Sequence, residues 1–262
     1  MTQVILPQAG SFIFSFFRYV GSLTLLFAQT LFTVFTTPLN TYRFLAQAKR
    51  VGPGSFLISS LVAFFVGMII SLQMAYMMIR LSAEIYIPNV VAVSLTRELG
   101  PVLTALIVAG RIGAGITAEI GTMVVTEQVD ALKAFALNPV RYLVVPRFLS
   151  LVVMLPILTV FAVIIGILGG FLICFFKLSI GYSTFWGMVT DSLATKDIVT
   201  GLLKTVFFAM IIAIVGCYEG LNVKGGADGV GKSTTLSVVR AFIFIIMFDC
   251  LFTFIFYFLF NA

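Results

Sequence analysis

The sequence predicts an all-α integral membrane protein, and two observations support this. Hydrophobic residues make up 61% of the 262 positions and charged residues only 10%, whereas a soluble domain carries roughly 25% charged residues. Apolar runs also recur that are long enough to cross roughly 30 Å of hydrocarbon, for which a helix needs about 20 residues. We therefore expect residues 1–262 to form a single transmembrane domain. Its five spanning helices are expected near residues 56–79, 101–125, 148–176, 198–218 and 236–260.

The N-terminal segment 11–37 is apolar but carries polar residues at three-, four- and seven-residue steps. On a helix they form one stripe, made of Ser11, Ser15, Arg18, Ser22, Gln29, Thr33 and Thr36. An amphipathic helix lying in the membrane interface fits this stripe better than a sixth span does. The first ten residues hold no Lys or Arg, so we expect no secretory signal here.

The distribution of cations predicts which helix ends face the cytoplasm. Loops near 40–55, 126–147 and 219–240 fall on one side of the predicted bundle and hold nine Lys or Arg residues, against four in the opposite loops. The nine are Arg43, Lys49, Arg50, Lys133, Arg141, Arg147, Lys224, Lys232 and Arg240, and the four are Arg80, Arg97, Lys177 and Lys196. Because positive residues accumulate in cytoplasmic loops, we expect the first set in the cytoplasm and the C-terminus in the periplasm.

The composition also argues against other classes of protein. The net charge of +6 comes from cations scattered singly between apolar runs, without the basic stripe typical of nucleic-acid-binding domains. His is absent, which removes the commonest general base and metal ligand. The three cysteines lie singly in apolar stretches, a pattern that favours neither a disulfide framework nor a zinc site. We expect no nucleic-acid partner, no metal and no catalytic residue in this chain.

Residues 226–233, GADGVGKS, match the nucleotide-binding P-loop pattern G-x-x-x-x-G-K-[ST]. That pattern binds phosphates only where a buried strand enters the loop and a helix leaves it. Here predicted membrane helices flank the motif on both sides, so we interpret it as a glycine-rich cytoplasmic turn with a helix starting at Ser233 or Thr234. A membrane-tethered nucleotidase, whose ATP binding would be lost in Lys232→Ala, is the alternative.

Polar side chains at membrane depth are the first candidates for a functional pathway. Each costs about 2.5 to 3.5 kcal/mol on insertion unless it is paired or faces water. The candidates are Gln73, Arg97, Glu98, Arg111 and Glu119. Arg97 and Glu98 open the second span, where two interpretations remain: an ion pair that anchors the helix in the interface, or a polar lining at which a substrate headgroup enters.

Small residues predict close helix packing at two places. The second span contains Ala105, Ala109, Gly110, Gly113, Ala114 and Gly115. Because small residues let helix backbones approach closely, we expect this span at the centre of the bundle or at a subunit seam. Gly166 and Gly170 form a second such pair on the third span, where packing alone is expected.

The stretch TEQVDALKAFALNP, residues 126–139, predicts a short amphipathic helix near 126–137 on the cytoplasmic side. Its apolar face would consist of Val125, Val129 and Leu132, and its charged face of Glu127, Asp130 and Lys133. Asn138-Pro139 would halt the helix. It is either a solvated connector or a plug that docks into a partner protein's groove, where Glu127 and Asp130 offer acceptors to the partner's Arg or Lys.

Four stretches resemble the MlaE-type permease subunits of lipid-transporting ABC systems in their order and spacing. They are RELGPVLTALIVAGRIGAGITAEIGTM, TEQVDALKAFALNPVRYLVVPR, GGADGVGKSTTLSVV and FDCLFTFIF. The resemblance covers about residues 56 to 260, and the long block in the second span is its most specific part. Many relatives carry G-x-x-R/K-A-T-T in the glycine-rich loop, so Lys232-Ser233 is a local departure from the family pattern.

The resemblance implies a homodimeric permease with five spans per subunit and an N-terminal interfacial helix. Two cytoplasmic ATPase subunits would bind the ATP and Mg²⁺ and power transport, and a periplasmic MCE-domain protein would exchange phospholipid or a similar amphipathic lipid with the dimer. By motif position, the helix around Glu127, Gln128 and Asp130 would be the coupling helix held by the ATPase. Arg97 and Glu98 would belong to an outward-facing lipid cavity.

Two localisations and two modes of transport remain open at this point. The bacterial inner membrane is the expected compartment, and the plastid inner envelope is the alternative. A self-contained ion-coupled carrier or channel, using Arg111, Glu119 and Asp249 as intramembrane charges, is the alternative to a permease subunit. Purified protein in vesicles separates the two modes, because a carrier moves its substrate without any ATPase.

Overall fold

The computed structural model describes the backbone of residues 2–38 and 40–260, and every element within these ranges is helical. The long helices are α1 (Thr2–Thr36), α2 (Thr41–Met78), α7 (Val145–Leu178), α9 (Thr195–Leu221) and α10 (Gly226–Phe260). The shorter ones are α3 (Ile87–Ser94), α4 (Gly100–Val108), α5 (Ala114–Val125), α6 (Gln128–Ala134) and α8 (Tyr182–Ser192). Two 3₁₀ turns are η1 (Ile79–Leu81) and η2 (Glu84–Tyr86), and three π-helical turns are η3 (Leu95–Leu99), η4 (Ala109–Gly113) and η5 (Val140–Val144).

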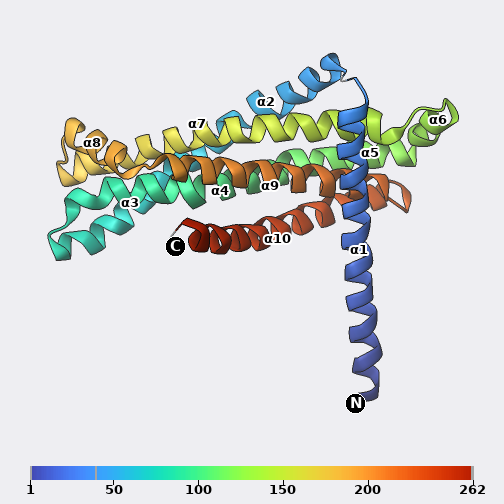
Figure 1. The fold of residues 1–262 in the computed structure, drawn as a ribbon, viewed down its shortest axis with the longest axis horizontal. Helices are drawn as coiled ribbons and strands as arrows, with labels where there is room; N and C mark the ends of the chain where they lie inside the picture. The colour runs from blue at the N-terminus through green and yellow to red at the C-terminus, as the bar shows by residue number, and fades with distance from the viewer. Residues whose placement is uncertain (1, 39, 261–262) are drawn as a thin grey trace.

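The helices form an elongated bundle that α1 crosses from one side. Helices α2, α7, α9, α10 and the run from α3 to α5 lie roughly along one direction, whereas α1 runs across them (Figure 1). One end of the bundle, called here the α6 end, carries α6 and the connection 222–225; the opposite α8 end carries α8 and the turns η1 and η2 (Figure 1). The prediction of an all-helical membrane-type protein is confirmed.

Within the described residues, six helical runs, one more than the five spans predicted, are long and apolar enough to cross a membrane. They cover Phe17–Thr36, Thr41–Leu81, Glu84–Val125, Val140–Leu178, Thr195–Leu221 and Gly226–Phe256. The additional run is α1, whose composition alone does not distinguish an interfacial helix from a span. Four of the other five contain the predicted spans, and the last, Gly226–Phe256, starts ten residues before the predicted span 236–260 and overlaps most of it. Helix α2, with 38 residues, is about 57 Å long at 1.5 Å per residue, which is longer than the roughly 30 Å of hydrocarbon in a membrane. Its N-terminal part, residues 41–55, is more polar than the rest, and a prediction from apolar runs alone does not include it.

Helices α2 and α7 pack closely because glycines remove side chains from their crossing. A Cβ atom at Gly67 would overlap the carbonyl oxygen of Gly166, and one at Gly169 would overlap that of Phe64. A Cβ atom at Gly170 would lie 2.9 Å from the Ser71 hydroxyl. The packing role predicted for Gly166 and Gly170 is therefore confirmed.

Gly67→Ala is expected to destabilise the fold by about 1 to 3 kcal/mol, the usual cost of forcing an extra methyl group into a packed contact. The added Cβ would push α2 away from the Gly166 backbone. Thermal unfolding in detergent measures the loss. Gly187→Ala in α8 is the matched control, since a Cβ atom there meets nothing within 4 Å. Equal melting temperatures for both variants would contradict the packing role of Gly67.

The run from α4 to α5 lies at the centre of the bundle, as its small residues predict. Ala105 and Ala109 are fully buried, and Gly113 lies against α9, since a Cβ atom there would be 3.3 Å from Ile212. A buried apolar core joins this run to α7, α9 and α10, and a second core at the α8 end joins α2, α3, α7 and α8. This central run holds Arg111 and Glu119 of the predicted pathway residues, and Arg97 and Glu98 lie directly before it in η3.

Candidate functional site

A buried lysine organises a polar cluster inside the bundle. The Lys204 side chain, on α9, is only 2% exposed. Its Nζ donates to Glu98 Oε2 of η3 at 2.5 Å and to the Thr253 hydroxyl of α10 at 2.8 Å. It also pairs with Asp249 Oδ1 of α10 at 2.9 Å. This lysine cluster of Glu98, Lys204, Asp249 and Thr253 joins three segments, with two carboxylates on one ammonium.

Arg97 lies next to the lysine cluster in sequence but has a different partner. Its Nε lies 3.4 Å from Asp197 Oδ1, and its own side chain is about half exposed. Asp197 is buried, and its other oxygen accepts from the Ala194 backbone N–H at 3.2 Å, which caps the start of α9. Arg97 and Glu98 therefore pair with α9 and α10 rather than with each other.

A second charged group, called here the arginine cluster, consists of Arg50, Arg111, Glu119 and Arg147. Glu119 on α5 receives Arg50 of α2 on one carboxylate oxygen and Arg147 of α7 on the other, the latter at 3.2 Å. Arg111 on η4 donates to the carbonyl oxygen of Gly54, and its Nη1 lies 3.2 Å from the Ser55 hydroxyl. The cluster ties α2, η4–α5 and α7 together.

The five predicted pathway residues thus do not form one continuous site. Glu98 and Arg97 lie in or beside the lysine cluster, and Arg111 and Glu119 belong to the arginine cluster. Gln73 is exposed on the outer surface of α2. The structure places two separate charged groups along the central helical run, and Gln73 lies outside both.

Sequence reasoning missed Lys204, Glu219 and Arg147 as candidate residues. The signal was present for Lys204, because a single lysine inside the predicted span 198–218 is as costly as the residues that were chosen. Glu219 and Arg147 were counted with the loops, although the structure buries both. The error arises because α7 and α9 extend beyond the predicted spans, so that residues assigned to loops lie on helices.

Glu219 connects α1 to the rest of the bundle. The Tyr19 hydroxyl of α1 donates to Glu219 Oε1 at 2.6 Å, and Arg240 of α10 pairs with the same oxygen. The Arg240 guanidinium also lies over the Tyr19 ring, 4.4 Å from its centroid. The crossing helix is therefore held on α9 by a hydrogen bond and on α10 by a cation–π contact, and the ion pair joins α9 to α10 at the same place.

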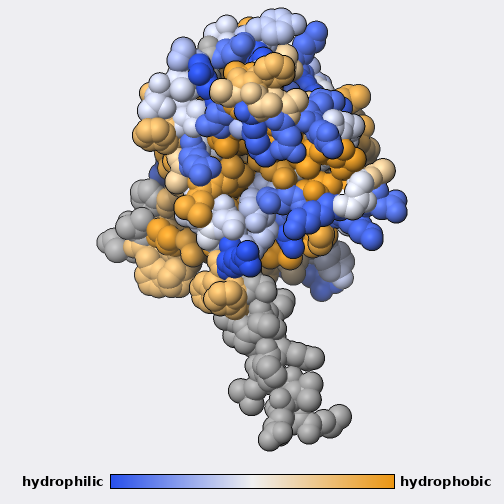
Figure 2. Space-filling view, turned by 90° about the vertical axis from the view of Figure 1, so that its right-hand side faces the viewer, coloured by the Kyte–Doolittle hydropathy of each residue, from blue (hydrophilic) through white to orange (hydrophobic). Residues whose placement is uncertain are grey.

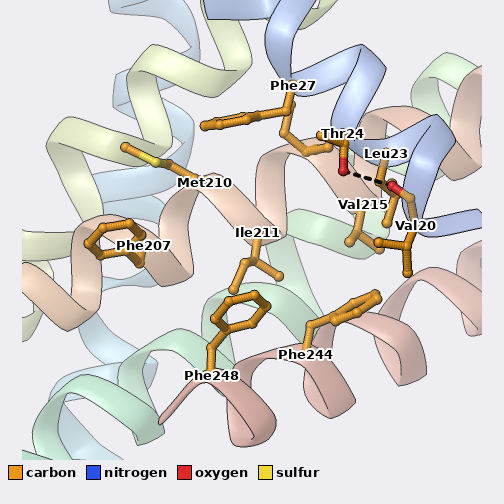
Figure 3. A pocket seen from close by; sticks show the side chains of 11 residues that line it. Val20, Leu23, Thr24, Phe27, Phe207, Met210, Ile211, Val215, Phe244 and Phe248 are labelled. Carbon is orange, nitrogen blue, oxygen red and sulfur yellow. Dashed lines mark hydrogen bonds between the residues drawn. The ribbon is translucent and has the colours of Figure 1, made fainter. Parts of the chain in front are cut away.

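An apolar cavity of about 290 Å³ lies beside this connection, between α1, α9 and α10. Figure 3 shows Phe27 and Leu23 of α1 on one side of the cavity, with Phe207 of α9 and Phe248 of α10 facing them. The one polar side chain in the lining, Thr24, donates to the Val20 carbonyl at 2.9 Å. The lining therefore offers little but hydrocarbon contact and suits an apolar guest.

The α6 end of the bundle is polar, and α6 projects from it. Figure 2 views this end and shows hydrophilic residues gathered over it. Glu127, Gln128, Asp130 and Lys133 are all exposed, and Lys133 pairs with Asp130 at 2.8 Å. On the apolar side Val129 is buried, whereas Val125 is exposed. The predicted charged face is present.

The predicted bounds of this helix, 126–137, are wrong at both ends. Helix α6 spans Gln128–Ala134 because Glu127, at φ 59°, and Ala136, at φ 56°, adopt left-handed conformations. Asn138-Pro139 does not halt it, since it ends before them. A left-handed backbone conformation is rarely predictable from sequence for residues other than Gly, Asn and Asp.

Residues 226–233 do not form a P-loop. They are the first two turns of α10, and they follow a connection after α9 with no strand in the described part of the chain. The Gly229 N–H already donates to the Gly225 carbonyl at 3.3 Å, so the stretch forms helical turns and not the open loop after a strand that surrounds a phosphate. The interpretation that this stretch is no P-loop agrees with the structure, but the helix start expected at Ser233 or Thr234 is wrong. Gly225 and Gly226, at φ +91° and +66°, turn the chain, and α10 begins at Gly226.

Comparison with known proteins gives consistent matches along the chain. Residues 44–255 match the family model described as Permease MlaE. A probable ABC transporter permease protein of Rickettsia prowazekii is 39% identical over 257 residues, which is 98% of this chain and 99% of the relative. The corresponding protein of Synechocystis is 44% identical over 203 residues, or 78% of this chain and 77% of the relative. A relative from Pyropia yezoensis, ycf63, is 42% identical over 214 residues, with 82% and 81% covered.

Proposed function

The chain belongs to the MlaE permease family of ABC transporters, and on that premise we propose that it moves a phospholipid or a similar amphipathic lipid between the inner membrane and a periplasmic MCE-type carrier. It would act as a dimer, with ATP and Mg²⁺ bound by two cytoplasmic ATPase subunits. A periplasmic MCE-domain protein would exchange lipid with the dimer. The chain itself would be a transport subunit and not an enzyme.

In the proposed arrangement of this single transmembrane domain, five parts span the membrane, namely α2, α3–α5, α7, α9 and α10. Helix α1 lies in the membrane interface. The crossing direction of α1 supports this (Figure 1), as do large apolar side chains exposed on its outer face, namely Phe14, Phe17, Leu25, Phe32 and Phe35. The cation-rich α6 end would face the cytoplasm and the C-terminus the periplasm. A bacterial inner membrane fits this arrangement. The ycf63 relative is compatible with the alternative location, a plastid inner envelope.

The observation that carries the proposal is the projecting helix α6. A helix of seven residues that buries only Val129 contributes little to the core, and its exposed polar groups would stabilise a contact with another protein. An ATPase groove lined with Lys or Arg would match Glu127 and Asp130, and Gln128 and Lys133 would add hydrogen bonds. Movement of α6 by the ATPase would then change the cavity between two copies of the chain.

The pairing of the intramembrane charges favours a permease over an ion-coupled carrier. Both oxygens of Glu119 are occupied by arginines, and Asp249 is held by Lys204. Arg111 is bonded to a backbone carbonyl. A proton- or ion-coupled carrier needs a carboxylate that is free to bind the ion in one state.

Reconstitution tests the proposal directly. Vesicles containing this chain alone are expected to move no labelled phospholipid, whereas vesicles containing the chain with its ATPase subunits and the MCE-domain acceptor should move it when ATP is added. Quenching of the label by a membrane-impermeant reagent, or its appearance on the acceptor, measures transport. Lipid movement by the chain alone, driven by an ion gradient, would support the carrier instead.

A further inference from the structure

We propose that Arg50 and Arg111, in the seam between α2 and η4–α5, bind the phosphate of a phospholipid headgroup. The inference rests on the proposed function, since it names a place where the transported class of lipid is held. It follows from the charge balance of the arginine cluster, from the donors that remain open, and from the position of the seam on the bundle surface.

The arginine cluster holds more positive than negative charge. Its three guanidinium groups face one carboxylate, Glu119, whose two oxygens are taken by Arg50 and Arg147. Within the described residues, no other carboxylate pairs with any of these arginines. Arg147 is only 5% exposed, so the unbalanced charge reaches the surface at Arg50 and Arg111. An anion from outside the chain would complete the cluster.

Donors remain open on both exposed arginines. A guanidinium carries five N–H donors, and Arg111 uses Nη1 alone, for the Gly54 carbonyl and the Ser55 hydroxyl. Arg50 pairs through its Nη1 with one oxygen of Glu119. The other guanidinium nitrogens of both residues have no partner among the described side chains.

Glycines on the facing helices make room for the two arginines. A Cβ atom at Gly54 would lie 3.1 Å from Arg111 Nη1, and one at Gly115 would lie 3.5 Å from Arg50 Nη2. Gly54 follows Arg50 by one helical turn, and Gly115 follows Arg111 likewise, so each arginine lies against the helix that carries the other. The two guanidinium groups would then reach one phosphate from opposite sides of the seam.

The seam lies where the apolar outer surface of the bundle begins. On α2 the exposed residues change from Lys49 and Arg50 to Phe56, Leu57 and Ile58. A phosphate held by the arginines would therefore have its acyl chains along α2, at the level where headgroup meets hydrocarbon.

A phosphodiester matches these features better than a free anion does. Arginine binds phosphate oxygens through two parallel N–H donors, and basic pockets between membrane helices are typical binding places of anionic lipid headgroups. A free phosphate would satisfy the charge but leave the adjoining apolar surface unused. Both a lipid headgroup and a free phosphate would supply the phosphate oxygens, but only the lipid would also contact the adjoining apolar surface.

Native mass spectrometry of the purified chain with added phosphatidylglycerol tests the inference. Arg111→Gln should weaken binding roughly tenfold, the loss expected for one hydrogen bond to a charged group, and Arg111→Lys should weaken it less. Arg80→Gln, an exposed arginine at the α8 end, is the matched control and should bind as the wild type does. Diacylglycerol, which lacks the phosphate, should not be retained.

Three results would overturn the inference. They are equal phosphatidylglycerol binding by Arg111→Gln and the wild type, retention of diacylglycerol as tightly as phosphatidylglycerol, and displacement of the lipid by an equal concentration of inorganic phosphate, which would indicate a free-anion site. ATP-driven transport by the wild-type complex is measured separately. Loss of transport with intact lipid binding refutes the proposed function alone, and transport without this binding refutes the lipid site alone.

Discussion

Replacing Glu127 and Asp130 together by arginine is expected to abolish ATP-driven lipid transport while leaving the chain folded and inserted. Glu127, directly before α6, and Asp130, on α6, are both exposed and contribute nothing to the buried core, so the fold should tolerate the change. Two negative charges become positive on the surface proposed to contact the ATPase, and like charges placed opposite each other across an interface cost several kcal/mol. Copurification of the ATPase subunits and transport in vesicles are the measurements.

A charge reversal of the same size at the other end of the bundle is the control for this experiment. Glu84→Arg with Asp191→Arg changes the net charge equally at the α8 end, and this variant should retain its ATPase subunits. Normal transport by the Glu127→Arg, Asp130→Arg variant would show that α6 is only a solvated connector.

Lys204→Met is expected to destabilise the chain by about 3 kcal/mol, the lower end of the range for removing one partner of a buried ion pair. The change leaves Glu98 and Asp249 near each other without their shared cation. The lower end applies because these carboxylates are 39% and 21% exposed, so water screens part of their charge. Thermal unfolding of the purified chain in detergent measures the loss.

Neutralising the partners should restore stability if the unpaired charge is the cause. The variant Lys204→Met, Glu98→Gln, Asp249→Asn removes all three charges while keeping similar volumes, and replacing a buried ion pair by neutral groups is often tolerated. It is expected to melt near the wild type. If it melted as low as Lys204→Met alone, the lost packing of the lysine stem would explain the effect instead.

Helix positions were largely predictable from sequence, because long apolar runs leave few alternatives. The central place of the second span followed from its small residues, and the structure confirms it. The ends of the helices were not predictable in the same way. Helix α10 starts at Gly226 because of two glycines with positive φ, and α6 is shortened by left-handed Glu127 and Ala136, conformations that residue type alone does not specify.

The sequence did not predict which side chains the site residues pair with. Glu98 and Lys204 lie 106 positions apart, and Tyr19 and Glu219 lie 200 apart. Local spacing shows which residues share a helix face, but it does not show which helices become neighbours. For that reason Glu98 and Arg97 were considered as a pair. In the bundle Arg97 pairs with Asp197 of α9, whereas Glu98 pairs with Lys204 of α9 and accepts from Thr253 of α10.

The orientation of the bundle is the central claim, and cysteine labelling tests it most directly. Cys174 and Cys217 are buried, so a chain with Cys250→Ser offers a low background for Ala131→Cys on α6 and, separately, Lys196→Cys at the α8 end. In spheroplasts, a membrane-impermeant maleimide should label the chain with Lys196→Cys, and should label the chain with Ala131→Cys only after the membrane is permeabilised. Labelling of Ala131→Cys in intact spheroplasts would contradict a cytoplasmic α6 and the coupling role that depends on it.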